Sequence, residues 1–209
     1  MTDFSRQTLQ EFLGALASEA PTPGGGTAAA VAGAMGAALA GMVATLTLSR
    51  EKYAQGHDAV RPIGEAAAAA RSGLLALARR DAEAYDAVVA ARRLPKESEE
   101  QKASRSSAVA AATRQAAEIP METARLAVRL LEALPELVEK GNPNAASDAG
   151  AAALLLEAAT EAALLNVSIN LSGAEDPDFV SRMQKETADL QVQAQRLRSH
   201  VLAAVRKRF

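Results

Sequence analysis

The chain has 209 residues, of which 49% are hydrophobic, 3% are aromatic and none is cysteine. Its 23 lysines and arginines against 25 aspartates and glutamates give a net charge of −2, so no overall positive field attracts nucleic acid or an anionic membrane. Disulfides and thiolate chemistry are excluded, which fits a reducing, cytoplasmic location. Acidic residues occupy the N-terminal segment, so we expect no export signal there. The length predicts a single domain over residues 1–209.

Apolar residues recur at helical spacing, and strand-like alternation is missing, so we predict an all-α bundle of about six helices with long central helices. The first helix covers residues 4–16, with Thr2 or Ser5 as its cap. The second covers residues 27–48. Its uncharged sequence is long enough to cross a bilayer, but a composition of Ala, Gly and Thr predicts a central helix that is buried on nearly all sides. Small residues are expected to allow close helix approach: Gly33, Gly36, Ala40 and Gly41.

The third helix is expected over residues 58–91, before Leu94-Pro95. The fourth begins near Glu97. Pro120 falls inside its pattern and is expected to kink or split it, and the pattern then continues to Pro135.

A loop over residues 140–144 precedes the fifth helix, which is predicted over residues 145–171. The sixth helix opens with Asp176 as its cap and Pro177 at its first position. Its apolar residues alternate steps of four and three, which predicts coiled-coil-like packing. These residues are Met183, Thr187, Leu190, Ala194, Leu197, Val201 and Ala204.

A glycine-rich motif precedes the second helix. Residues 21–27 read Pro-Thr-Pro-Gly24-Gly25-Gly26-Thr27, so the first backbone N–H groups of the helix are expected to be available to a carboxylate or phosphate. The alternative is a loop whose glycines only permit tight backbone approach. No Gly-Lys-Ser/Thr follows, so the motif is not a Walker loop.

Short polar residues also gather before the fifth helix. Asn142, Asn144, Ser147 and Asp148 supply donors, acceptors and one carboxylate, as recognition of a polar heterocycle requires. Capping of the helix by Ser147 or Asp148 is the simpler alternative.

Asp81 and Tyr85 lie one turn apart on the third helix and share a face. A structural hydrogen bond between them is the alternative to a functional role. Asp148 and Asn166 also share a face, but about 27 Å separates them along the fifth helix. They can therefore line one small pocket only across a dimer interface, and we interpret Asn166 as a residue that hydrogen-bonds between helices.

Lys52 follows the uncharged helix and could meet an anionic ligand tail, unless it only belongs to a solvated helix end. His57 and His200 have no histidine partner at helical spacing, so no metal site is predicted.

Five segments, in this order, resemble the formiminotransferase-cyclodeaminase C-terminal family. The segments are residues 21–27, 47–53, 81–85, 141–150 and 166–170. No formiminotransferase domain accompanies them, so the chain is similar to stand-alone members. The resemblance implies an all-helical homodimer or larger homo-oligomer without metal or organic cofactor. It also implies a pocket near the subunit contact that includes Asp81, Tyr85 and Asp148.

The activity that the resemblance implies is formiminotetrahydrofolate cyclodeamination, which yields 5,10-methenyltetrahydrofolate and ammonia. Methenyltetrahydrofolate cyclohydrolase is the alternative, and a non-catalytic folate-binding protein is a second one. We expect Asp148 or Asp81 to move protons. Asn144 and Ser147 are then expected to hold the pterin, and Lys52, or the amides of residues 24–27, to bind the glutamyl carboxylate.

Overall fold

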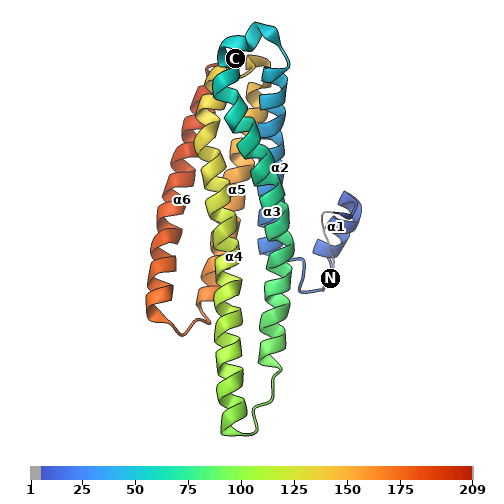
Figure 1. Cartoon of the computed structure of the whole chain (residues 1–209), viewed down its shortest axis with the longest axis vertical. Helices are drawn as coiled ribbons and strands as arrows, with labels where there is room; N and C mark the ends of the chain where they lie inside the picture. Colours follow the sequence, from blue (N-terminus) through green and yellow to red (C-terminus); the bar gives the residue numbers. More distant parts are fainter. Residues whose placement is uncertain (1–5, 209) are drawn as a thin grey trace.

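The computed structural model describes residues 6–208, and within this range every regular element is helical (Figure 1). The α-helices are α1 (Leu9–Leu16), α2 (Gly25–Leu48), α3 (His57–Arg92), α4 (Glu99–Lys140), α5 (Ala146–Leu171) and α6 (Pro177–Arg206). Two short 3₁₀ helices, η2 (Glu51–Gly56) and η3 (Pro143–Ala145), lie in the connections. The all-α fold class and the number of helices are as predicted.

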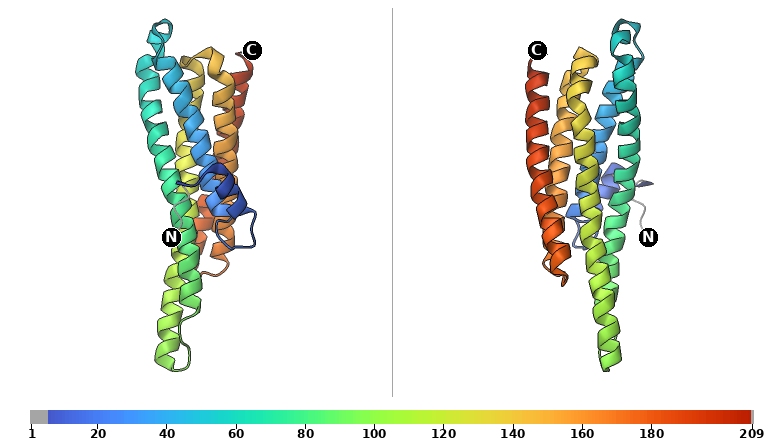
Figure 2. Two further views of the ribbon diagram at one scale, coloured as in Figure 1. Left: turned by 90° about the vertical axis from the view of Figure 1, so that its right-hand side faces the viewer. Right: turned by 60° about the vertical axis from the view of Figure 1, so that its left-hand side comes forward.

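α2 to α6 run alternately up and down (Figure 1). The hairpin between α3 and α4 extends beyond the other helices, and α1 is set to one side of α2 (Figures 1 and 2). α6 packs on α4 and α5 through the predicted seam, in which Met183, Ala194 and Val201 are buried. The N-terminal end of α2 lies beside the place where the hairpin of α3 and α4 begins to extend beyond the other helices (Figure 1).

α1 begins later than predicted. Thr8 is its cap: the Thr8 hydroxyl accepts a hydrogen bond from the Glu11 amide at 3.2 Å, and the Glu11 carboxylate accepts one from the Thr8 amide at 2.7 Å. This reciprocal pair is a capping box, which satisfies two amides at the helix start. The predicted caps, Thr2 and Ser5, lie outside the described residues.

The ends of the later helices follow from their sequences. Ser98 and Gln101 form a second capping box at the start of α4. Asp176 caps α6, with its carboxylate accepting from the amides of Asp178 and Phe179, and Pro177 is the first helical residue, as predicted. Proline fits there because the first helical amide has no partner inside the helix.

The predicted split at Pro120 is wrong, and so is the predicted end at Pro135. α4 is one helix from Glu99 to Lys140 and contains both prolines. A proline removes the hydrogen bond to the carbonyl four residues earlier, which for Pro120 is that of Ala116. That carbonyl accepts instead from Nδ2 of Asn170, at 2.7 Å. A neighbouring helix thus satisfies the backbone group that the proline leaves free.

Glycines bring α2 close to its neighbours, as predicted. A Cβ at Gly36 would lie 2.9 Å from Cγ of Leu156 in α5, and one at Gly33 would lie 3.2 Å from Cδ1 of Leu74 in α3. Both distances are shorter than ordinary carbon contacts, so the Gly36 position requires glycine, whereas a side chain at Gly33 would need its neighbours to shift by a few tenths of an ångström. Gly41 differs, because its nearest neighbour would be at 3.8 Å, which leaves room for a side chain.

α2 is central but not buried on nearly all sides. Met35 and Met42 are 54% and 39% exposed, and on the adjacent α5 Leu165 and Ile169 are 72% and 68% exposed. By length and composition α2 and the segment 143–171 could each cross a membrane, but 50% and 44% of their most apolar windows are buried inside the bundle. Core helices of a helical bundle have the same composition. The half that stays exposed is apolar and is not covered by the described residues.

Candidate functional site

A cavity of about 460 Å³ opens at the N-terminal end of α2, between α3 and α5. It brings together several residues that the sequence singled out far apart in the chain: Gly24, Gly25, Gly26, Asp81 and Tyr85. The other residues that line it are Pro21, Thr22, Val88, Arg92, Ala116, Asn166, Ile169, Asn170 and Ser172. The cavity therefore combines a helix start, one carboxylate, one guanidinium and several amides.

Asp81 reaches across from α3 to the first turn of α2. Its Oδ2 accepts a hydrogen bond from the Thr27 hydroxyl at 2.9 Å. No hydrogen bond joins Asp81 to Tyr85 among the described residues, so the structural bond considered between those two is not the one that forms. Tyr85 instead lines the cavity and is 44% exposed. Gly24 is the N-cap residue of α2 and has no side chain to accept a hydrogen bond from the first turn. The Asp81 carboxylate accepts one in its place.

Burial raises the pKa of the Asp81 carboxyl above its usual value of 3.8. Hydrogen bonds from the side chain and backbone of Thr27 oppose this shift, because they stabilise the ionised form. The net direction is upward, which makes the carboxyl a better proton carrier near neutral pH than an exposed aspartate.

The triple glycine permits this close approach. A Cβ at Gly26 would overlap Oδ1 of Asp81 and lie 2.7 Å from its Cγ. A Cβ at Gly25 would lie 3.2 Å from Nδ2 of Asn166. The glycines therefore allow close approach and also create a polar site, because the groups that come close to the backbone are a carboxylate and a side-chain amide.

Asn166 does not have the predicted role, and Asn170, the other asparagine near the end of α5, has it instead. The Asn166 amide donates to the carbonyl of Ala162 in its own helix, at 2.8 Å, and so does not join two helices. Asn170 makes the contact between helices, to Ala116 of α4. Our interpretation of Asn166 was wrong because the face that carries it packs on the start of α2, beside Gly25.

The short polar residues predicted before the fifth helix form a second group, which lies at the opposite end of α2. Asn142 is buried there, and its Oδ1 accepts from the Tyr53 hydroxyl at 2.8 Å and from the Asn144 amide at 3.0 Å. The backbone N–H of Asn142 donates to Oγ1 of Thr47 at 2.9 Å. These bonds tie the connection before α5 to the end of α2, which gives Asn142 a structural task.

The remaining members of the second group surround this connection. Lys52 lies in η2 with its Nζ 4.7 Å from the centre of the Tyr53 ring. Ser147 and Asp148 belong to the first turn of α5, but neither caps it: the N-cap is Ala145, without a side-chain hydrogen bond. Ser147 is exposed and Asp148 is half-buried.

Within one chain the two groups do not share a cavity. Thr27 and Thr47 mark the two ends of α2, and twenty residues of helix separate them by about 30 Å. Asp148 therefore meets the cavity at Asp81 only if it comes from another copy.

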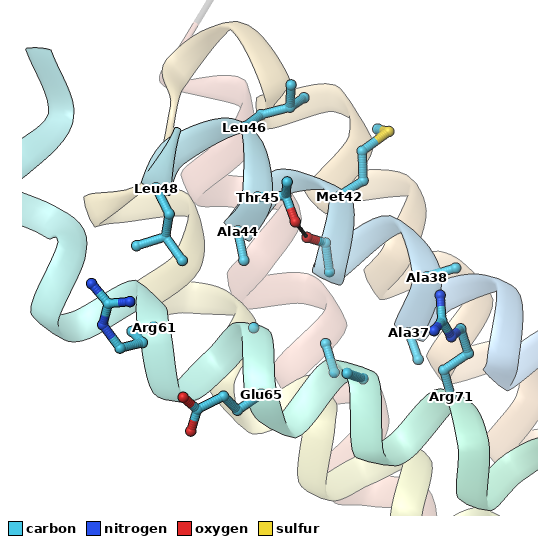
Figure 3. A pocket seen from close by; sticks show the side chains of 14 residues that line it. Ala37, Ala38, Met42, Ala44, Thr45, Leu46, Leu48, Arg61, Glu65 and Arg71 are labelled. Carbon is cyan, nitrogen blue, oxygen red and sulfur yellow. Dashed lines mark hydrogen bonds between the residues drawn. The ribbon is translucent and has the colours of Figure 1, made fainter. Parts of the chain in front are cut away.

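A second hollow, of about 660 Å³, lies between α2 and α3 (Figure 3). Its α2 wall is apolar, with Met42, Leu46 and Leu48, whereas α3 contributes the charged side chains of Arg61, Glu65 and Arg71. It contains none of the predicted site residues, and no acid there is paired with a hydroxyl or glycine-rich turn. Within residues 6–208 no three His, Asp or Glu side chains gather as a metal ion requires.

Sequence reasoning missed Arg92 and the contact that Asn170 makes between helices. Arg92 could have been found, because Asp81, Tyr85, Val88 and Arg92 follow steps of four, three and four, the spacing of one helix face. Asn170 could not, since its partner is a carbonyl that only the packing of α5 on α4 brings near.

Residues 8–189 match the family described as formiminotransferase-cyclodeaminase. A Methylorubrum extorquens protein named methenyltetrahydrofolate cyclohydrolase is 38% identical over 202 residues, which cover 97% of each chain. The formimidoyltransferase-cyclodeaminase of Rattus norvegicus is 32% identical over 201 residues, and the match spans 37% of that longer protein.

A solved structure is also similar. The crystal structure of formiminotetrahydrofolate cyclodeaminase from Thermotoga maritima superposes with a TM-score of 0.87 and 34% sequence identity. The match covers 97% of this chain and 98% of that one. Likeness of this extent covers nearly the whole helical bundle.

Proposed function

Since this chain belongs to the formiminotransferase-cyclodeaminase family, we propose that it is a one-carbon folate enzyme whose reacting groups meet at Asp81. The observation that carries this proposal is the cavity at the start of α2, where a partly buried carboxyl with a raised pKa faces a glycine-rich turn and two asparagines. Amides and a proton carrier at one place suit a reduced pterin with a reactive one-carbon unit.

Cyclodeamination of 5-formiminotetrahydrofolate is the first candidate reaction. The ten-position nitrogen attacks the formimino carbon and gives up its own proton, and a proton is delivered to the departing nitrogen. The bond between that nitrogen and the carbon then breaks, which releases ammonia and leaves 5,10-methenyltetrahydrofolate. Asp81 would deliver that proton, and its carboxylate would then offset the positive charge of the methenyl product. A raised pKa favours proton delivery, because the group holds its proton until the leaving nitrogen takes it.

Hydrolysis of 5,10-methenyltetrahydrofolate is the second candidate, favoured by the name of the relative that is 38% identical along its whole length. Here water adds to the methenyl carbon, a proton leaves to Asp81, and the ring opens to 10-formyltetrahydrofolate. The same carboxyl serves as base rather than acid. Neither reaction as written requires a metal or organic cofactor.

The decisive experiment follows the absorbance of the methenyl group with each substrate in turn. Its appearance from 5-formiminotetrahydrofolate identifies the cyclodeaminase, and its accelerated loss identifies the cyclohydrolase. In either reaction we expect Asp81→Asn to lower turnover at least tenfold, which corresponds to about 1.4 kcal/mol of activation free energy. Tight folate binding without turnover would instead indicate a binding protein.

We also propose that a second copy of the chain covers the apolar side formed by α2 and α5. Met35, Met42, Leu154 and Leu165 are exposed there, and α2 carries no charge along its length. A two-fold axis across α2 would place the glycine turn of one copy beside Asp148 of the other. A second copy is therefore the occupant that would join the two predicted groups into one site.

This arrangement has a direct measurement. The protein is expected to sediment as a dimer or larger oligomer in detergent-free buffer, and Met35→Glu should shift it toward monomers. Val192 is a similarly exposed apolar residue on α6, which packs on α4 and α5, so Val192→Glu is the matched control and should not change the oligomeric state. A wild-type monomer, or a protein that needs detergent to stay in solution, contradicts a second copy as the occupant.

A further inference from the structure

Asp81 and Arg92 are the two charged side chains among the residues that line the cavity. Both belong to α3 and are eleven residues apart, so they share one face and lie about 16 Å from each other along the helix axis. Tyr85 and Val88 lie between them and also line the cavity. This wall therefore presents a carboxylate, an aromatic ring, an aliphatic side chain and a guanidinium in that order.

The opposite wall comes from the last turns of α5 and the residue that follows them. Asn166 lies level with Gly25 at the inner end, and Ile169 and Ser172 continue outward. Tyr85 and Ile169 both remain largely exposed, at 44% and 68%. The middle of the cavity is thus bounded by two accessible apolar surfaces, between which a flat aromatic group can pack.

Within the described part of the chain, the side-chain charge of Arg92 has no opposite charge paired with it. Among residues 6–208 no carboxylate forms an ion pair with its guanidinium. Its backbone oxygen accepts a hydrogen bond from Nε of Arg105 at 3.1 Å, which fixes the end of α3 against α4. The backbone at Arg92 is therefore held in place while its guanidinium is available to a ligand.

Two other anion sites were expected from the sequence, and within one chain the geometry disfavours both for a ligand in this cavity. The backbone amide and hydroxyl of Thr27 already interact with Asp81, so an anionic tail there would face another carboxylate. Lys52 lies at the far end of α2. Arg92 is the remaining cation on the cavity wall.

We propose that Arg92 binds the carboxylate of the glutamyl arm of the substrate, while the aminobenzoyl ring packs between Tyr85 and Ile169. This inference rests on the proposed function, because it takes the one-carbon unit to be at Asp81. A guanidinium is suited to the task, since its planar set of donors matches a carboxylate with two parallel hydrogen bonds. Helix side chains also tilt toward the N-terminus, which turns Arg92 back toward Tyr85.

The test compares a substrate that has the glutamyl arm, methenyltetrahydrofolate, with methenyltetrahydropteroate methylamide, in which a neutral amide replaces the arm and no carboxylate remains. We expect Arg92→Gln to raise KM for the glutamyl compound at least tenfold with kcat nearly unchanged, and to leave KM for the pteroate amide unchanged. Arg92→Lys should restore part of the affinity. Arg93→Gln is the matched control, because Arg93 is the exposed neighbour and does not line the cavity.

Equal effects of Arg92→Gln on both compounds, or no effect on either, would overturn this subsite. If wild-type protein turns over neither compound, the cyclohydrolase reaction fails, but the subsite is still tested by calorimetric binding of tetrahydrofolate and tetrahydropteroate methylamide. A loss of affinity in Arg92→Gln for tetrahydrofolate alone supports the subsite. Equal affinities of the wild-type protein for the two ligands reject it.

Discussion

Asn170 occupies, with its side-chain amide, the hydrogen-bonding position that Pro120 leaves empty in α4. The acceptor is the carbonyl of Ala116, at 2.7 Å, and both Ala116 and Asn170 line the cavity. The proline therefore makes α4 dependent on α5 at the wall of the candidate site. One hydrogen bond both completes the backbone bonding of α4 and holds two cavity residues together.

This pairing predicts non-additive stability effects. Asn170→Ala should lower the free energy of unfolding by about 1–3 kcal/mol, because it leaves a carbonyl without its partner. In a Pro120→Ala background the new backbone amide can reach Ala116, so the same Asn170→Ala change should cost less. Both backgrounds lose the same side-chain volume, so chemical denaturation of the four proteins isolates the hydrogen bond. Equal costs in the two backgrounds would show that the proline is irrelevant to Asn170.

Gly26→Ala is expected to impair catalysis although alanine favours helices. The added Cβ would overlap Oδ1 of Asp81, so the carboxylate must move away from the start of α2. We expect at least a tenfold loss of kcat/KM and no gain in melting temperature. Gly14→Ala in α1 is the control, since nothing lies within 4 Å of its Cβ position, and it should keep full activity. Wild-type kinetics for Gly26→Ala would place the reacting group elsewhere.

Thr27 is expected to tune the pH dependence of activity. Its hydrogen bonds lower the pKa of Asp81 against the larger effect of burial, so Thr27→Val should raise that pKa further. Whether Asp81 acts as acid or base, the limb of the kcat/KM profile that reports its ionisation then moves to higher pH. Thr27→Ser keeps the hydroxyl and should leave the profile near that of wild type. A limb that stays fixed in Thr27→Val, or moves to lower pH, would show that it does not report Asp81.

Local signals were sufficient for most of the fold. Helical spacing and terminal residues such as Asp176 and Pro177 predicted the helices and several of their ends, because these features act within one or two turns of the chain. The failures at Pro120 and Pro135 have the opposite cause. A local rule predicts a break at proline, whereas packing in the assembled bundle keeps α4 continuous, in one case through Asn170.

The candidate site was predictable only in part for the same reason. The glycine turn and the pair Asp81 and Tyr85 could be recognised as motifs, but their meeting depends on how α3 lies against α2. Asn166 was misinterpreted because helical spacing gives the face of a residue and not the neighbour that covers it. The position of Asp148 relative to this cavity depends on a second copy, which no pattern within one chain describes.

A composite site can be tested by mixing two inactive proteins. If Asp81 of one copy and Asp148 of another act together, Asp81→Asn and Asp148→Asn are each inactive, but a heterodimer contains one site with both aspartates intact. After subunit exchange at equal concentrations, about a quarter of all sites should be restored, as two-fold symmetry requires. Each variant taken alone through the same exchange is the control and should stay inactive. Mass spectrometry that detects heterodimers without recovered turnover would remove Asp148 from the site, whereas recovery of activity requires that the two carboxylates come from different chains.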